Sequence, residues 1–228
     1  MNRLEGPFDA ALHLQDRQVV DVDGLLVCNV DDVELNESDD GTLSVTGLLI
    51  GAPALLPRFS GLLGRTLLEQ WRRLGIEKAD RLEPWRIDIS DVVELQSDVR
   101  LSVSREGLLV RAQNPAKGRT RPLDRLLGMN VRHGDESLGR VTDIRLEPRN
   151  SDHTTEFVCT HLVVGHGRPG SMLGYDRQQD MGPAILGHAI RWLHRHTGQL
   201  PISDVTDIDW EGAMITSRAE LSALAASS

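Results

Sequence analysis

The chain has 228 residues, of which 39% are hydrophobic, 26% charged and 4% aromatic, and its mean hydropathy is -0.26. This is enough apolar material for one large domain or two of ordinary size, and it excludes a disordered or collagen-like chain. The formal net charge of -9 disfavours nonspecific nucleic-acid binding, because that binding depends on cations that neutralise phosphates.

The sequence also predicts the compartment. No apolar run approaches the roughly 18 residues that a membrane-spanning helix needs. The first 16 residues carry acidic side chains where a signal peptide needs an uninterrupted apolar stretch. The two cysteines, Cys28 and Cys159, are too few for a disulfide framework, so we expect a reducing compartment, the cytoplasm.

Short β-rich runs alternate with turn signals in the first half of the chain. The dipeptide Asp23-Gly24 is typical of a hairpin turn, and Asp39-Asp40-Gly41 marks the next turn. Strands at this spacing favour a small barrel, which removes exposed edges by closing on itself. The expected strands are 19–22, 25–35, 43–50, 87–95 and 99–103.

One segment between these strands has helical periodicity. Leu63, Leu67, Trp71 and Leu74 recur at helical spacing, and Gly75 stands where a helix commonly ends. We therefore expect an amphipathic helix over 62–75 that packs its leucine face against the barrel.

The chain repeats itself, and the blocks keep one order while the length changes fall between them. This order predicts a tandem duplication, with a second helix over 185–198. The blocks match Asp32–Leu35 with Asp143–Leu146 at an offset of 111, Leu48–Gly51 with Leu162–Gly165 at 114, Leu62–Gly75 with Ile185–Gly198 at 123, Ile89–Val92 with Ile202–Val205 at 113, and Ser104-Arg105 with Ser217-Arg218 at 113.

A polar segment rich in proline and arginine separates the two repeats. Residues 105–126 carry six basic and two acidic side chains, between two acidic blocks. One interpretation is a solvated linker that attracts its acidic neighbours; the other is a docking strip for an anionic partner such as RNA or lipid headgroups. The candidate partner-binding residues are Arg111, Lys117, Arg119, Arg121 and Arg125.

Several short runs resemble the PRC-barrel family. They are Asp16–Gly24 followed by Val30–Leu35, Leu126–Val131 followed by Gly139–Ile144, and the closing strands Ile89–Val92 and Ile202–Val205. The first repeat, with Pro84-Trp85 before its closing strand, is most similar to the PRC-barrels that accompany magnesium-transporter cytosolic domains. The chain departs from these relatives because it lacks a membrane helix and a transporter segment, and the two helices enlarge a minimal barrel. The resemblance implies a binding module without a cofactor or chemistry of its own.

Other motifs favour structural interpretations. Gly165–Gly170 fits a G-x-G-x-x-G pattern, but no helix opens directly after it, as a dinucleotide site requires. Asp21–Asp32 has the length of a calcium loop, yet Leu25 and Leu26 stand where a ligand and a glycine belong. His188 and His196 share a helix face without further metal ligands nearby, so no metal site is predicted.

No catalytic constellation emerges from the sequence either. There is no G-x-S-x-G elbow, and neither cysteine has a recognisable family context. Asp91 and Asp204 follow a serine in both repeats and could do acid–base work as a carboxylate pair. Their recurrence is better explained by a turn or cap at the start of a strand.

Together these patterns predict a mainly β protein of two tandem PRC-type barrels, each with one inserted helix, at 1–112 and 125–228, joined by a linker at 113–124. The predicted function is a non-catalytic cytoplasmic adaptor that binds a protein partner and no cofactor. The alternatives are a regulatory subunit at the face of a membrane ion-transport complex, and an RNA- or ribosome-assembly-linked factor. The net charge disfavours RNA.

Overall fold

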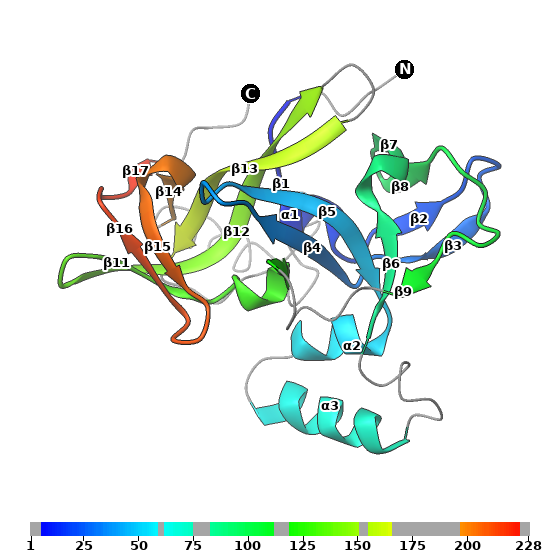
Figure 1. Ribbon diagram of the computed structural model, residues 1–228, viewed down its shortest axis with the longest axis horizontal. Coiled ribbons are helices and arrows are strands. Elements are labelled where there is room, and N and C mark those ends of the chain that lie inside the picture. The colour runs from blue at the N-terminus through cyan, green and yellow to red at the C-terminus, as the bar shows by residue number, and fades with distance from the viewer. Residues whose placement is uncertain are drawn as a thin grey trace, which may run out of the picture. The chain divides into compact units, whose positions relative to one another are not determined.

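The computed structural model describes residues 6–58, 62–74, 83–111, 119–150, 155–165 and 197–223, and these are mainly β (Figure 1). The chain divides into a first unit, residues 1–124 with 147–158, and a second unit, residues 125–146 with 159–228. Strands β12 (Glu136–Asn150) and β13 (Thr155–Gly165) therefore contribute residues to both units. Residues 185–196 of the helix expected over 185–198 and residues 166–170 of the Gly165–Gly170 motif lie outside the described residues, as do His188 and His196; Gly198, expected to end the helix, begins a strand.

The first unit is built around β5 (Leu43–Ile50), whose bounds agree with the expected strand. Antiparallel β4 (Asp32–Glu37) lies on one side of it, and β6 (Trp85–Asp88) and residues Phe157 and Val158 of β13 also pair with it. Two short strands extend this sheet: β9 (Val110–Arg111) pairs with β6, and β10 (Thr120–Pro122) pairs with β4. The turn between β4 and β5 contains Gly41 at a φ of 80°, which confirms the predicted turn.

A second sheet of the first unit has four strands in the order β3-β2-β8-β7. It forms from the hairpin predicted at Asp23-Gly24, where Gly24 has a φ of 76°. Strands β2 and β8 pair in parallel, and the other neighbours are antiparallel. Their bounds are β2 Gln18–Val20, β3 Leu26–Asn29, β7 Val92–Leu95 and β8 Asp98–Leu101.

Two of the expected strands are interrupted. The run 25–35 is split into β3 and β4 because Val30 directs its backbone bonds to residues 16 and 17: its N–H donates to the Arg17 carbonyl, and its carbonyl accepts from Asp16. The run 87–95 is split by a 3-10 helix, η2 (Ile89–Asp91). The Asp88 carboxylate caps the start of this helix by accepting from the Ser90 N–H at 3.0 Å. The sequence pattern marked the strands correctly and missed both breaks.

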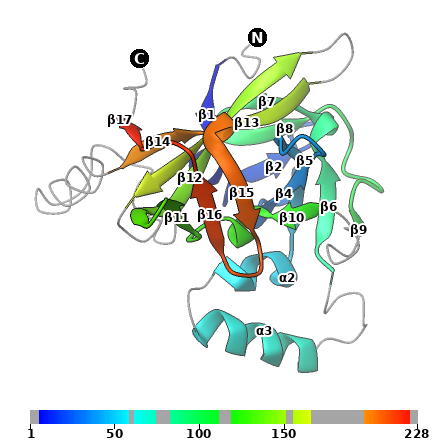
Figure 2. The ribbon, with the colours of Figure 1, turned by 60° about the vertical axis from the view of Figure 1, so that its left-hand side comes forward.

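The remaining elements of the first unit are short except for one helix. Helix α3 (Leu62–Leu74) contacts the 3-10 helix η1 (Leu56–Arg58) and helix α2 (Ala52–Leu55), and α2 and α3 lie next to each other in both ribbon views (Figures 1 and 2). At the N-terminal end, β1 (Phe8–Asp9) leads into α1 (Ala10–Leu14). Leu123 and Asp124 of the 3-10 helix η4 (Leu123–Arg125) also belong to this unit, and Arg125 belongs to the second.

The second unit contains β11 (Asn130–His133), the first part of β12 and the last part of β13. Its other elements are β14 (Gly198–Pro201), η7 (Ile202–Asp204), β15 (Val205–Asp209), β16 (Met214–Ser217) and β17 (Ser222–Ala223). Strand β11 pairs antiparallel with β12 and parallel with β16, and β14 pairs antiparallel with β13 and β17.

The two units repeat the same strand pairings. In the first, Leu48 of β5 lies opposite Ile87 of β6; in the second, Leu162 of β13 lies opposite Leu200 of β14. The parallel pairs β2–β8 and β11–β16 match in the same way, and so do β7–β8 with β15–β16, including a bulge, and β6–β9 with β14–β17. Independent packing solutions would not reproduce four registers. The registers also correct one block of the sequence repeat. Leu101 of β8 and Ser217 of β16 occupy matching positions, so the offset between these strands is 116 residues. The sequence analysis had matched Ser104 with Ser217, at an offset of 113.

Turns follow the same plan. The Ser102 N–H donates to the Asp91 carbonyl at 2.8 Å, and the Arg218 N–H donates to the Asp204 carbonyl at 2.9 Å. Both aspartates end a 3-10 helix that leads into a strand. This is the structural role that the sequence favoured for Asp91 and Asp204, which lie in different units. The closure of each unit into a separate PRC-type barrel stays a prediction.

Candidate binding surface

The basic residues proposed from the sequence occupy several elements. Arg111 belongs to β9, Arg121 to β10, and Arg119 directly precedes β10; Arg125 belongs to the second unit, and Lys117 lies outside the described residues. Part of the expected linker is therefore a strand of the first sheet, with Arg121 opposite Leu35, and Leu123 is fully buried. The described arginines of this set are thus divided between the two units.

Two of the exposed basic side chains already have partners. The Arg119 guanidinium is ion-paired with the carboxylate of Asp39 on the turn that follows β4. The Arg125 guanidinium donates to the Trp210 carbonyl at 3.2 Å. Binding of a polyanion at these positions would have to compete with both contacts, which weakens the hypothesis of an RNA-docking strip.

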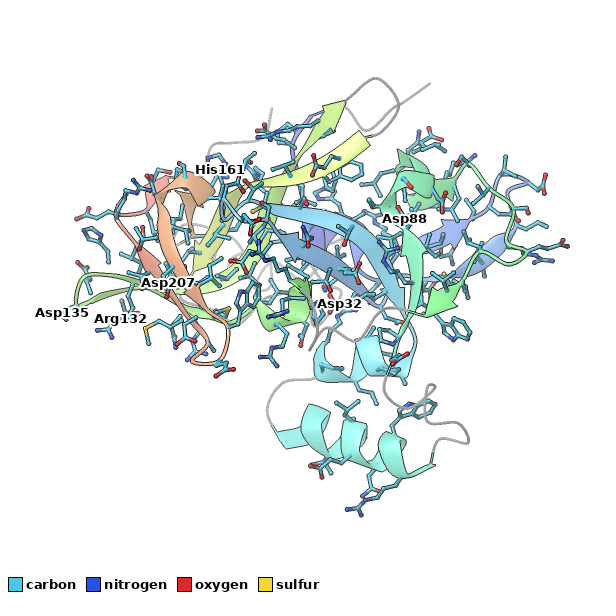
Figure 3. All side chains as sticks on the ribbon, viewed as in Figure 1. Asp32, Asp88, Arg132, Asp135, His161 and Asp207 are labelled. Carbon is cyan, nitrogen blue, oxygen red and sulfur yellow. The ribbon has the colours of Figure 1, made fainter. Side chains whose placement is uncertain are left out.

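Asp32 carries a strongly perturbed carboxyl group in the first unit. It is 1% exposed at the start of β4, where Figure 3 labels it, and it accepts hydrogen bonds from the Gln15 amide at 3.0 Å, the Val33 N–H at 2.8 Å and the Asp124 N–H at 3.3 Å. Burial raises the pKa of Asp32 to about 7, and the nearby Asp124 carboxylate adds to the rise while the donors oppose it. These bonds tie α1, β4 and η4 together, which is a structural role.

A second polar cluster bridges the central strands of the first unit. The Arg86 Nε lies 2.7 Å from a Glu34 carboxylate oxygen, and its Nη1 lies 2.9 Å from Asp88, which Figure 3 labels at the end of β6. The Thr46 hydroxyl donates to Glu34 at 2.8 Å, and the Thr46 carbonyl accepts from Arg86. Gly47 leaves room for this guanidinium, since a Cβ there would lie 2.7 Å from the Arg86 Nε. Glu34 is 7% exposed, and one of its carboxylate oxygens accepts from both Thr46 and Arg86, so this cluster links β4, β5 and β6.

A third cluster fastens the helical segment of the first unit. Arg58 of η1 forms a two-pronged contact with the Asp16 carboxylate at 2.7 and 3.2 Å and donates to the Asp31 carbonyl at 2.9 Å. The Asp31 carboxylate accepts from the Gly51 N–H at 2.6 Å, just before α2. Charged groups in this cluster again bind other parts of the same unit.

Neither cysteine is poised for nucleophilic chemistry. Burial raises the pKa of both Cys28 and Cys159 to about 12, with a further rise from the Asp31 and Asp143 carboxylates respectively, so both are thiols at neutral pH. Within the described ranges, no group of three or more His, Cys, Asp or Glu side chains is arranged to hold a metal ion.

Exposed apolar side chains mark a different surface. Among the described residues, every large apolar side chain that is clearly exposed belongs to the first unit. Four of the eight belong to the β2–β3 hairpin, turn included, or to β7: Val22, Leu25, Leu26 and Val93, which are 58%, 47%, 56% and 49% exposed. The other four are Leu67, Trp71, Trp85 and Val110.

Three of these residues sit together at the tip of the β2–β3 hairpin and are called the hairpin patch: Val22, Leu25 and Leu26. Asp21 builds the tip, because its carboxylate accepts from the Leu25 N–H at 2.8 Å, the Asp23 N–H at 3.0 Å and the Arg105 N–H at 3.3 Å. Burial raises the pKa of Asp21, but these backbone donors outweigh it and hold the pKa below its usual value. The tip therefore keeps its form without help from the three aliphatic side chains.

The matching hairpin of the second unit is polar. By register, Leu26 corresponds to Ser137, and the residue before it, Leu25, corresponds to Glu136. Figure 3 labels Asp135 at the tip of that hairpin, where its carbonyl accepts from Arg132 at 3.1 Å. On β7, Val93 corresponds to Thr206 of β15. The same backbone is thus apolar at its tip in one unit and polar in the other.

The sequence analysis did not identify the hairpin patch as a surface. It assigned Leu25 and Leu26 to the expected strand over 25–35. Comparing DVDGLL with its counterpart RHGDES in the other repeat would have located the patch.

The chain was also compared with known proteins. It matches no family model and no curated protein. In the part of the chain that the structure describes, no helix combines the length and the apolar character that crossing a membrane requires.

Proposed function

We propose that the chain is a non-catalytic cytoplasmic adaptor of the PRC-barrel type, and that its first unit carries the surface that docks a protein partner. One observation carries this proposal: in the described residues, the exposed large apolar side chains are all in the first unit. Three of them follow one another closely at the tip of the β2–β3 hairpin, and exposed apolar groups that lie together are typical of interaction sites.

The polar clusters support a binding function over a catalytic one. Asp32, Glu34 and Arg58 each bind other groups of the fold through two or more contacts. A general acid or base has to present its side chain to a substrate. The buried carboxylates of this unit are directed at backbone and side-chain donors instead.

The two rival functions differ in what they require of the surface. An RNA-linked factor would use Arg119, Arg121 and Arg125, of which Arg119 is already ion-paired with Asp39. A regulatory subunit of a membrane complex would use the same apolar surface as an adaptor, so it differs in the partner and not in the docking site.

The test uses the full chain at its natural abundance. The chain is tagged in its own cells, cross-linked there with a short amine-reactive reagent, purified and quantified by mass spectrometry before and after ribonuclease treatment. We expect one protein recovered in near-equal amount, unchanged by ribonuclease. A chain recovered alone would overturn the adaptor proposal, and a partner lost with ribonuclease would replace it with the RNA-linked function.

A further inference from the structure

We propose that the hairpin patch, Val22, Leu25 and Leu26, inserts into an apolar pocket with a basic rim on the protein partner. This inference rests on the proposed function and specifies where the partner binds and what chemistry it presents. The observations that carry it are the exposure of three neighbouring aliphatic side chains, a prebuilt tip, and the acidic surroundings of that tip.

The tip is built to present these side chains. Asp21 fixes the turn through three backbone bonds, and Gly24 adopts a φ of 76°, which glycine accepts without strain. The side chains of Val22 and Leu25 are therefore not needed to form the turn. A tip held in this way loses little conformational entropy on binding, which favours its use as an insertion element.

The outer face of the sheet continues from the patch. By register, Leu26 lies opposite Val20, Val20 opposite Arg100, and Arg100 opposite Glu94, whereas Val19 and Val99 are buried on the other face. Val93 lies in the bulge beside Glu94 and is 49% exposed. Leu26 is thus the apolar end of a face whose centre holds an Arg100–Glu94 ion pair, whereas Leu25 pairs with Asp21 and, as the preceding residue, belongs to the opposite side of the hairpin.

The acidic residues around the hairpin patch indicate the charge of the partner surface. The two segments that form this sheet, residues 18–29 and 92–106, contain five acidic and two basic residues. Arg100 is ion-paired with both Glu94 and Asp98, and Asp23 is exposed at the tip itself. A pocket rimmed by Lys or Arg complements these carboxylates, and complementary charge raises both specificity and the association rate.

The same charges disfavour the other occupants. Two copies of the chain docked through this patch would bring like-charged carboxylates together at the interface. An anionic lipid surface would repel the acidic surroundings, since membrane-surface binding uses basic residues beside the apolar ones. A basic-rimmed protein surface is therefore the occupant that fits.

The experiment places a photoactivated cross-linking residue, p-benzoylphenylalanine, at Val22 of the full chain in its own cells. The matched control carries it at Asp135, on the polar hairpin of the second unit. We expect one dominant protein adduct from position 22 and none from position 135, with the linked partner peptide apolar and flanked by Lys or Arg.

A double variant tests whether the leucine side chains themselves are needed for cross-linking from position 22. Leu25→Glu with Leu26→Ser gives the first hairpin the residues of the second, and both side chains are exposed, so the urea midpoint should be unchanged. The yield of the position-22 adduct should fall about tenfold, because each lost leucine anchor weakens binding severalfold. The converse exchange, Glu136→Leu with Ser137→Leu, should leave the yield unchanged.

Each alternative result decides against the assignment. A lipid adduct, a self-adduct, equal adducts at positions 22 and 135, a partner peptide flanked by acidic residues, or an adduct that survives the double variant would overturn it. If the amine-reactive reagent recovers a partner while position 22 gives no adduct, the hairpin assignment fails and the adaptor proposal stands. If neither method recovers a partner, both fail.

Discussion

At the scale of single residues, Asp32 shows how burial and hydrogen bonding oppose each other. Its carboxylate accepts hydrogen bonds from Gln15, Val33 and Asp124, and these donors favour the ionised form. Burial and the Asp124 carboxylate favour the neutral form and prevail, raising the pKa to about 7. The matching residue of the second unit, Asp143, accepts from the Ile144 N–H at 2.7 Å and is half-buried.

The raised pKa makes stability depend on pH. In the folded chain Asp32 holds its proton up to about pH 7, whereas in the unfolded chain it releases it near pH 4, so ionisation favours unfolding as the pH rises between these values. Between pH 5 and pH 8, we expect Asp32 to lower the unfolding free energy of the natural chain by about 2–3 kcal/mol. The variant Asp32→Asn should lack this fall. Urea titrations at both pH values measure this loss.

Asp143→Asn is the control for that measurement. It removes a carboxyl group at the matching position of the second unit and should leave the pH dependence close to that of the natural chain. A parallel pH dependence in the natural chain and Asp32→Asn would show that Asp32 titrates as an exposed carboxylate.

At the scale of elements, the duplication lets two strands be compared in one register. Arg86 of β6 and Gln199 of β14 stand at matching positions, opposite Leu49 and Val163. In the first unit the position is filled by the ion pair with Glu34. In the second, Gln199 is 5% exposed and its Nε2 makes no hydrogen bond within the described residues. The same strand pairing therefore holds an ion-paired arginine in the first unit and a buried glutamine in the second.

This difference predicts unequal costs for the same substitution. Arg86→Met leaves the buried Glu34 without its cation, and we expect the unfolding free energy to fall by about 3 kcal/mol. Gln199→Met removes a buried amide nitrogen that has no partner in the described part of the chain, and should change the unfolding free energy by less than about 1 kcal/mol. Urea unfolding of both variants provides the comparison.

The double variant Glu34→Leu with Arg86→Met separates the ion pair from packing. Replacing both partners by apolar side chains removes the uncompensated charge and should recover most of the loss. Equal losses for Arg86→Met and Gln199→Met, or no recovery in the double variant, would contradict the role given to this pair.

The sequence predicted what local pattern controls. It placed β5 at its observed bounds, because eight residues of β-forming sequence follow a clear Asp-Gly turn. It missed the breaks at Val30 and at Ile89–Asp91, since both depend on hydrogen bonds with specific partners. It assigned Thr120–Pro122 to a linker because the segment is polar, whereas pairing with β4 is a long-range contact that composition does not encode.

The candidate surface was predictable to a smaller extent. The charge pattern identified Arg119 and Arg121 as candidates. The ion pair of Arg119 with Asp39 and the hydrogen bond of Arg121 to the Thr120 carbonyl are seen only in the folded structure. Exposure of Leu25 and Leu26 depends on which face of the hairpin is covered, and an alternation interrupted by a turn does not reveal that. The internal repeat held the missing information, because the two hairpins share a backbone and differ in polarity.

At the scale of the whole molecule, neither of the two compact units is a single continuous stretch of the chain. The first unit includes residues 147–158, which follow 22 residues of the second unit in the chain. Phe157 is 1% exposed in the first unit, with its ring 5.5 Å from that of Phe8 in an edge-to-face arrangement. It lies opposite Val45 of β5, and Val158 lies opposite Ser44. A division of the chain after Asp124 therefore removes part of the first core.

This arrangement predicts that a fragment of residues 1–124 is much less stable than the first unit in the full chain. Truncating a buried phenylalanine to alanine costs about 3–5 kcal/mol, and the fragment loses Phe157 together with Val158 and their pairing with β5. We expect no cooperative urea transition for the fragment by circular dichroism, and a loss of about 3–5 kcal/mol for Phe157→Ala in the full chain. If the fragment unfolds cooperatively with the stability of the full chain, residues 147–158 are dispensable for the first core, and the hairpin patch could then be studied on a single repeat.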